Sequence, residues 1–309
     1  MFSLLKSDKK LIKPAFFLLL AAAAFLCFSM SGAAAKGAER SFGDVVQFRL
    51  GGSTLSTSAV QGILDKRDAQ GEDVRYTAWT QEKSAVIENY GLGGKSSFDR
   101  ALCYYGDNNG VFNLIRDNGC ALSPVTAFKV FGTTEGISGE NVLINGELYV
   151  VEKLLYDESA SVVYKAKEDK AGAAFDVLDV VIGKQNPVSV SEIQMNYNIR
   201  GDIVIYYREV ISFFGLSFYI PDSFIPTRWS EFEFWSDTFK SYGNSVKYYF
   251  SMKTYAPDEV FRSYMIKTAV FGLLFWAAAI AIAVFGFKII KERGIRIGVN
   301  SFKKHFEKI

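Results

Sequence analysis

Residues 142–151 read VLINGELYVV and carry the clearest local signal in the chain. Asn145-Gly146 stands between two largely apolar runs. A two-residue turn between antiparallel strands needs a positive φ at both central positions, which asparagine and glycine adopt with little strain. The stretch therefore predicts a β-hairpin.

A short helix is predicted just before this hairpin, within residues 118–132 (NGCALSPVTAFKVFG). Ser123 is a suitable N-cap, and Pro124 occupies the first helical position, where its missing N–H costs nothing. Gly132 is expected to end the helix. The residues expected to supply its apolar contacts are Val125, Phe128, Val130 and Phe131.

Further short elements are predicted around these two. A helix capped by Ser56 or Thr57 should end near Gly71, and residues 91–97 (GLGGKSS) should form a loop. Alternating or apolar runs predict strands at 42–50, 74–81, 84–88, 162–165 and 175–182. Interspersed short strands and helices are typical of an α+β domain, which we expect over residues 36–186.

Two uncharged apolar runs flank this domain. Residues 14–35 and the run 269–287, within a helix expected at 264–287, are each long enough to cross about 30 Å of hydrocarbon as a helix. The sequence thus predicts two transmembrane helices. The first run also has features of a cleavable signal peptide, with lysines before it and Ala33 to Ala35 at its end, and both alternatives stay open.

Charge placement predicts the orientation. Residues 1–13 carry four lysines and one aspartate, a net charge of +3, and residues 288–309 carry seven basic and two acidic residues, a net charge of +5. Because the whole chain carries +2, the part between these ends carries −6. Positively charged segments stay in the cytoplasm, so we expect both ends on the cytoplasmic side of the cell membrane and the central domain on the outer side.

The segment at 187–263 is rich in tryptophan, tyrosine and phenylalanine. Such rings suit the headgroup zone of a membrane and also fill helical cores. We expect a membrane-proximal helical stalk here, with Pro257 starting a helix that continues into the second crossing. The basic tail at 288–309 has two interpretations: contact with membrane lipid, or docking to a cytoplasmic partner.

The sequence offers little catalytic chemistry. The one histidine, His305, lies in the tail, so histidine-based triads and metal sites are excluded from the outer domain. Gly94-Lys95-Ser96 lacks the earlier glycine of a phosphate-binding loop, because that position is Asn89. We expect no enzymatic activity and no cofactor. Without a basic face interleaved with aromatic residues, we also expect no nucleic-acid partner.

Cys103 and Cys120 are the two cysteines of the outer domain. A disulfide between them would stabilise the fold by roughly 3 kcal/mol. The alternative is two reduced, partly buried thiols, and the sequence does not choose between them.

Three stretches together resemble the MacB/FtsX class of ABC-transporter permeases. Ser123, Ala127, Phe131 and Gly132 match the family's helix, Tyr149, Val150 and Val151 match its hairpin, and Glu292, Arg293, Ile295 and Arg296 match the stretch after its second crossing. Glu152 stands where the family commonly has glycine. The resemblance covers residues 42–182 loosely, both crossings and the tail.

The resemblance implies a periplasmic-core-like outer domain and a tail that contacts a separate ATPase. Family permeases carry two further crossings, whereas this chain stops at Ile309, so a further permease subunit and an oligomer are expected partners. The first functional hypothesis is therefore a permease-like subunit of an export or mechanotransmission system. The second is a membrane-anchored binding or scaffold module without transport activity.

Overall fold

The computed structural model describes residues 2–91, 93–109, 112–155, 160–167, 173–183, 189–199, 201, 203–215, 232–251 and 254–306. The chain divides into two units. One unit comprises 1–36, 214–219 and 265–309, and the other comprises 37–213 and 220–264.

The helices are α1 (Phe2–Phe42), α2 (Thr57–Gln70), α3 (Pro124–Phe131), α4 (Val190–Tyr197), α5 (Tyr207–Gly215), α6 (Phe232–Ser251) and α7 (Ala256–Phe306). The first strands are β1 (Val45–Arg49), β2 (Leu55–Ser56), β3 (Val74–Glu82), β4 (Ala85–Asn89), β5 (Lys95–Phe98) and β6 (Ala101–Gly106). They are followed by β7 (Gly119–Leu122), β8 (Asn141–Ile144), β9 (Glu147–Leu154), β10 (Val162–Lys165), β11 (Ala174–Phe175), β12 (Val177–Ile182) and β13 (Ile203–Tyr206).

The first unit is built from the long parts of α1 and α7, which pack against each other. The Phe28 and Phe275 rings lie 5.6 Å apart, and Ser31 Oγ donates a hydrogen bond to the Thr268 carbonyl oxygen at 2.9 Å. Both helices contain segments long and apolar enough to cross a membrane, at Ala15–Phe42 and Ala256–Phe287. Large apolar side chains outside the helix contact, such as Leu19 and Leu273, are exposed and suited to lipid.

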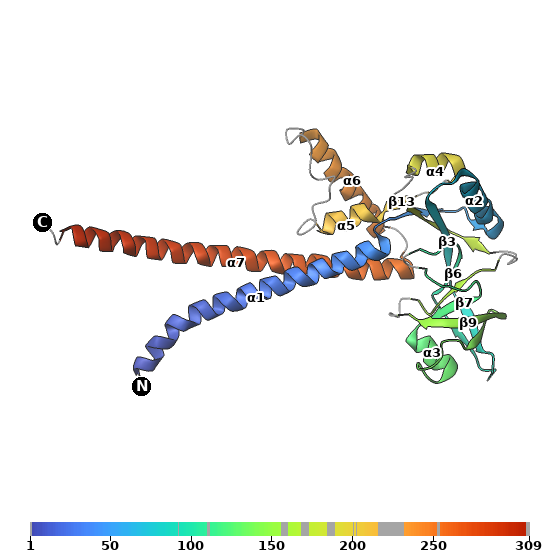
Figure 1. The fold of residues 1–309 in the computed structure, drawn as a ribbon, viewed down its shortest axis with the longest axis horizontal. Helices are drawn as coiled ribbons and strands as arrows, with labels where there is room; N and C mark the ends of the chain where they lie inside the picture. The colour runs from blue at the N-terminus through green and yellow to red at the C-terminus, as the bar shows by residue number, and fades with distance from the viewer. Residues whose placement is uncertain are drawn as a thin grey trace. The chain divides into compact units, whose positions relative to one another are not determined.

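The second unit is a mixed α/β domain around a large sheet (Figure 1). In the described part of the chain the strand order is β13-β1-β12-β3-β6-β10-β7-β9-β8-β4-β5. The pairs β6–β10 and β7–β9 are parallel and the other neighbouring pairs are antiparallel. Helices α2 and α4 lie near one end of the sheet and α3 near the other. The main core lies between these helices and the sheet.

The hairpin and both short helices are confirmed. Asn145 and Gly146 have φ values of 53° and 87° between β8 and β9, as the turn requires. Ser56 Oγ and Ser123 Oγ accept N–H groups at the starts of α2 and α3, and α3 ends at Gly132 with φ 74°. These features form where the sequence predicts them because each depends on a few neighbouring residues.

The contact face of α3 differs from the expectation. Val125 and Phe128 are exposed, whereas the helix buries Thr126, Ala127 and Val130. Positions three apart share a helix face, so Val125 and Phe128 lie together on the side away from the sheet. The positions of the apolar residues in the sequence therefore do not identify which face of α3 is buried.

Three expected boundaries also differ. Helix α1 runs to Phe42, so the first strand starts later than expected; Phe42 packs on Phe261 with ring centroids 5.2 Å apart. Part of the expected loop at 91–97 is strand β5, paired with β4. Within the expected stalk at 187–263, β13 pairs with β1 and extends the sheet, because its apolar residues complete an edge of the domain. Trp229, one of the aromatic residues of the expected stalk, lies outside the described residues.

Candidate functional site

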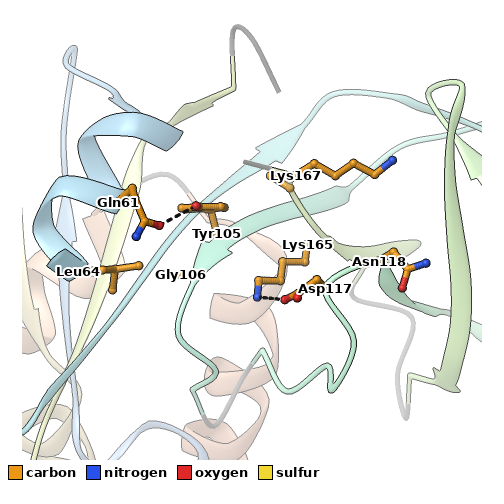
Figure 2. A pocket seen from close by; sticks show the side chains of 9 residues that line it. Gln61, Leu64, Tyr105, Gly106, Asp117, Asn118, Lys165 and Lys167 are labelled. Atoms are coloured by element: carbon orange, nitrogen blue, oxygen red, sulfur yellow. Dashed lines mark hydrogen bonds and ion pairs between the residues drawn. The ribbon is translucent and has the colours of Figure 1, made fainter. Parts of the chain in front are cut away.

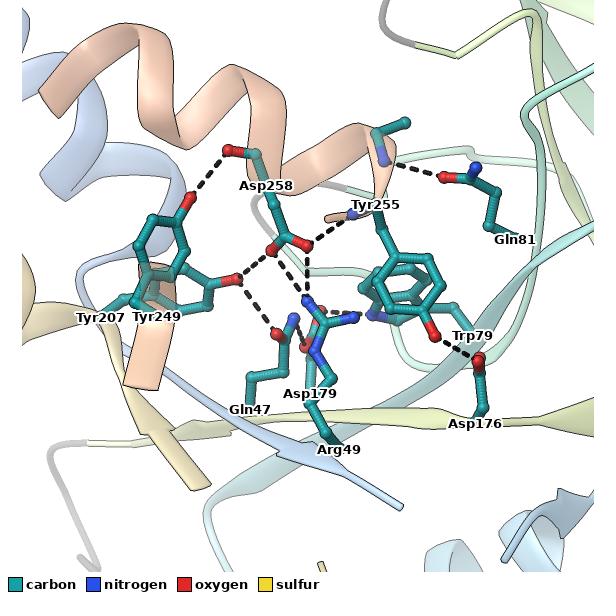
Figure 3. Close-up of polar contacts among 11 residues, drawn as sticks. Gln47, Arg49, Trp79, Gln81, Asp176, Asp179, Tyr207, Tyr249, Tyr255 and Asp258 are labelled. Carbon is teal, nitrogen blue, oxygen red and sulfur yellow. Dashed lines mark hydrogen bonds and ion pairs between the residues drawn. The ribbon is translucent and has the colours of Figure 1, made fainter. Parts of the chain in front are cut away.

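A buried polar cluster lies where the sheet meets the start of α7 (Figure 3). We call it the Asp258 cluster. Its members come from β1, β3, β12, α5, α6, the first turn of α7 and the residue just before α7: Gln47, Arg49, Trp79, Asp179, Tyr207, Tyr249, Tyr255 and Asp258.

Strand alternation places the sheet members of the cluster on one face. Gln47 and Arg49 are two positions apart on β1, whereas Phe48 between them points into the main core. Gln47 lies opposite Asp179 of β12 in the antiparallel register. Trp79 of β3 points to the same side, because its indole Nε1 donates to Asp179 Oδ2 at 2.9 Å.

The start of α7 supplies the carboxylate at the centre of the cluster. Asp258 is the third residue of the helix, and its Oδ2 accepts the N–H of Tyr255, just before the helix, at 2.8 Å. This bond satisfies an N–H that the helix itself cannot bond. The Ala256 N–H is likewise bonded to Gln81 Oε1 of β3 at 2.8 Å. The first turn of α7 is thus held by side chains as well as by its own backbone.

Arg49 and Asp258 form a buried ion pair. Arg49 Nη2 lies 2.8 Å from Asp258 Oδ1 and 2.7 Å from Oδ2, with side-chain exposures of 8% and 0%. The guanidinium carbon lies 4.3 Å from the centre of the Tyr255 ring. Burial alone would lower the pKa of Arg49, but the combined attraction of Asp258, Tyr207, Asp179 and Tyr255 outweighs it and the pKa is raised. Arg49 therefore stays protonated.

Asp179 is the second buried carboxylate of the cluster. It accepts hydrogen bonds from Gln47 Nε2 at 2.8 Å, Trp79 Nε1 at 2.9 Å and Asn109 Nδ2 at 3.2 Å. Burial raises its pKa to about 6, although the Gln47 and Trp79 donors and the Arg49 charge act in the opposite direction. The Arg49 guanidinium is thus paired with Asp258, and its charge also acts on Asp179.

Tyrosine hydroxyls connect the remaining elements. Tyr207 OH of α5 lies 3.1 Å from Asp258 Oδ1 and 3.2 Å from Gln47 Oε1, and burial holds its pKa well above the usual value. Tyr249 OH of α6 donates to the Asp258 carbonyl oxygen at 2.7 Å. Because Asp258 is fully buried and bonded on all sides, the cluster is arranged to hold the beginning of α7 to the sheet.

A surface hollow of about 610 Å³ lies elsewhere on the same unit (Figure 2). Tyr105 OH donates to Gln61 Oε1 at 2.8 Å on one side, and Lys165 Nζ lies 2.6 Å from Asp117 Oδ1 on another. The bond from Lys165 lowers the pKa of Asp117. The hollow offers both charges and apolar surface, as ligand-binding pockets do.

The strand order bears on the two alternatives for Cys103 and Cys120, a disulfide or two reduced thiols. Neither Cys103 of β6 nor Cys120 of β7 is in a disulfide, both are buried, and β10 lies between their strands. Tyr164 of β10 pairs with each of them. Two strand spacings amount to roughly 9–10 Å, whereas a disulfide needs Cα atoms within about 7 Å. This fold therefore keeps the thiols apart.

The other predicted contact residues are in the tail. The stretch with Glu292, Arg293, Ile295 and Arg296 belongs to α7. The structure does not describe the side chains of these four residues. No group of three or more metal-ligating side chains is found among the described residues. Sequence reasoning missed the Asp258 cluster, for which the available signal was Gln47 and Arg49 at alternate positions of an otherwise apolar strand.

No family model and no curated protein matches the sequence. Solved structures of similar fold include the periplasmic region of MacB from Actinobacillus actinomycetemcomitans, at 13% identity and a TM-score of 0.36, covering 55% of this chain and 92% of that one. Another is the extracellular domain of the noncanonic ABC-type transporter YknZ from Gram-positive bacteria, at 14% identity and a TM-score of 0.32, covering 51% and 96%. These values describe a distant likeness.

Proposed function

We propose that this protein is a permease-like membrane subunit of an ABC-type export or mechanotransmission system. In this proposal both ends lie in the cytoplasm, the mixed α/β domain lies outside and engages substrate or a partner, and the tail contacts a separate ATPase. The chain itself is not an enzyme. The charge distribution and the resemblance of residues 123–151 and 292–298 to such permeases support this assignment.

The observation that carries the proposal is the attachment of Asp258. Its carboxylate is held by Arg49 of the sheet, and Asp258 lies in the first turn of a helix that runs from Ala256 to Phe306. That helix contains the second candidate span and most of the basic tail. A displacement of the sheet would act on the first turn of α7 through a bonded contact rather than through a loose linker.

Affinity purification of the full chain from native membranes tests the partner. We expect a nucleotide-binding subunit to co-purify, and a variant with Arg293→Glu and Arg296→Glu to lose most of it. A matched variant with Lys303→Glu and Lys304→Glu changes the tail charge equally, outside the stretch that resembles permeases. Absence of any nucleotide-binding protein would refute the ATPase-linked role.

The hollow near Tyr105 and Lys165 favours a second candidate function, an anchored binding or scaffold module. A volume of about 610 Å³ is within the range of small-molecule sites. This candidate predicts that ligand binding persists without any ATPase and that the purified complex contains no nucleotide-binding chain. The same co-purification therefore separates the two functions.

A further inference from the structure

A second hollow, of about 280 Å³, lies beside the end of α1 in the α/β unit. Its lining comes from the last turn of α1 and the start of β1, from β3 and β12, and from the chain between β6 and β7. The polar residues that matter here are Arg40, Ser41, Asp44, Arg75, Asn108 and Asn113.

The hollow has an excess of positive charge. Arg40 makes no hydrogen bond or ion pair within the described part of the chain, and Arg75 Nη1 has one long bond, to the Asn108 carbonyl oxygen at 3.4 Å. Asp44 is the one carboxylate in the lining, and its Oδ1 is paired with Arg208 Nη2 at 2.9 Å. Two guanidinium groups therefore remain without a carboxylate partner there.

The loop behind these arginines is held in place by bonds of its own. Asn109 is 4% exposed, accepts the Phe112 N–H at 2.7 Å and donates to Asp179 at 3.2 Å. Asn108 Nδ2 donates to the Leu114 carbonyl oxygen at 2.8 Å. A fixed wall with two guanidinium groups, a hydroxyl and an amide nearby presents several donors to one anion, and guanidinium geometry matches phosphate oxygens.

The position of Arg40 in the chain indicates where such an anion could come from. Arg40 follows Ala35, the last residue of the uncharged run, by five positions within the continuous helix α1. At about 1.5 Å per residue this is a rise of about 7.5 Å. The polar layer on each side of the hydrocarbon is about 5–8 Å deep, so Arg40 reaches the depth of lipid phosphates.

We propose that this hollow binds a phosphate group, supplied either by an anionic phospholipid headgroup or as free phosphate. Arg40 and Arg75 provide the charge, and Ser41 and Asn113 provide neutral hydrogen-bond donors. The inference does not depend on the transport role, because it uses the anchoring helix and the lining residues alone. Anion binding would place a membrane or solution component directly on the wall that also carries Asn109.

Hydrogen exchange of the peptide spanning 37–45 in the full chain, purified in neutral detergent, gives a readout local to this hollow. The probes are inorganic phosphate, micelles containing phosphatidylglycerol, and micelles containing phosphatidylcholine as the reference. We compare the wild type, the double variant Arg40→Gln with Arg75→Gln, and the variant Arg116→Gln. Arg116 is an exposed arginine that lines a different hollow.

The wild type and Arg116→Gln should show slower exchange with phosphatidylglycerol or inorganic phosphate than with the reference. In the double variant, the half-saturating concentration should rise by about tenfold or more, because charge-assisted bonds are lost. Protection by phosphatidylglycerol alone assigns the site to lipid, and equal protection by inorganic phosphate assigns it to the free anion. No protection in the wild type, or equal protection in the double variant, overturns the proposal.

Discussion

Arg49 of β1 and Asp258 of α7 are 209 positions apart in the sequence, yet the Arg49 guanidinium contacts both oxygens of the Asp258 carboxylate at 2.8 and 2.7 Å. The pair is almost completely removed from solvent. It joins the first strand of the α/β domain to the helix that contains the second candidate span. The contribution of this ion pair to the free energy of unfolding can be measured directly.

Asp258→Asn should reduce the free energy of unfolding by about 3–5 kcal/mol, because it leaves the Arg49 charge buried and unpaired. Chemical denaturation of the full chain in detergent measures the change. Asp44→Asn is the matched control: it breaks the exposed pair with Arg208 and should cost about 1 kcal/mol or less. Equal losses in the two variants would contradict the role assigned to the buried pair.

Asp179 should make stability depend on pH in a defined direction. Its pKa is raised to about 6 in the folded protein, so its contribution is fully present below its unfolded pKa of about 4 and is lost as the pH rises through about 6. The wild type should therefore gain about 1 kcal/mol relative to Asp179→Asn between pH 6 and pH 5. Denaturation of both proteins at several pH values measures this difference, and parallel pH profiles would argue against it.

Two glycine-to-alanine substitutions should change the stability of the folded protein in opposite directions. Gly106 has a φ of 108°, and an added Cβ would lie 2.4 Å from the Tyr76 carbonyl oxygen, so Gly106→Ala should cost about 2 kcal/mol or more. Gly62 lies inside α2, and a Cβ there meets nothing within 4 Å, so Gly62→Ala should stabilise by about 0.5–1 kcal/mol. Thermal unfolding distinguishes the two. Loss of stability in both would show that the environment of Gly62 differs from the one described.

Cys103 and Cys120 should remain reduced even under oxidising conditions. Strand β10 separates them, and burial raises the pKa of the Cys120 thiol to about 12, which suppresses the reactive thiolate. Mass spectrometry after alkylation should find both thiols unmodified in the folded protein and both modified after denaturation. Recovery of a peptide linking Cys103 to Cys120 from folded protein would contradict this strand order.

The sequence predicted the features that depend on neighbouring residues. The Asn145-Gly146 turn and the Ser123 cap each arise within a few positions, and the apolar runs of the two long helices need no distant partner. Composition could therefore give the mixed fold class and the two candidate spans. It could not say which face of α3 is buried, because that depends on which strands pack beneath it.

The long-range features were beyond the sequence because they depend on strand order. The distance between Cys103 and Cys120 is set by β10, which comes more than forty residues after Cys120 and inserts between β6 and β7. In the same way, nothing local marks Asp258 as the partner of Arg49. The sequence predicts a strand at Phe42, whereas Phe42 is the last residue of α1. Its contacts with Tyr207 and Phe261 come from distant segments, so no neighbouring residue indicates them.

Hydrogen exchange of the amides at 255–262 tests the central claim most directly, namely that Asp258 fastens the first turn of α7 to the sheet. In the wild-type full chain these amides should be protected. In Asp258→Asn their exchange should accelerate by about tenfold or more, while α2 at 57–70 stays unchanged and Asp44→Asn has no effect. Unchanged exchange at 255–262 in Asp258→Asn would contradict the claim.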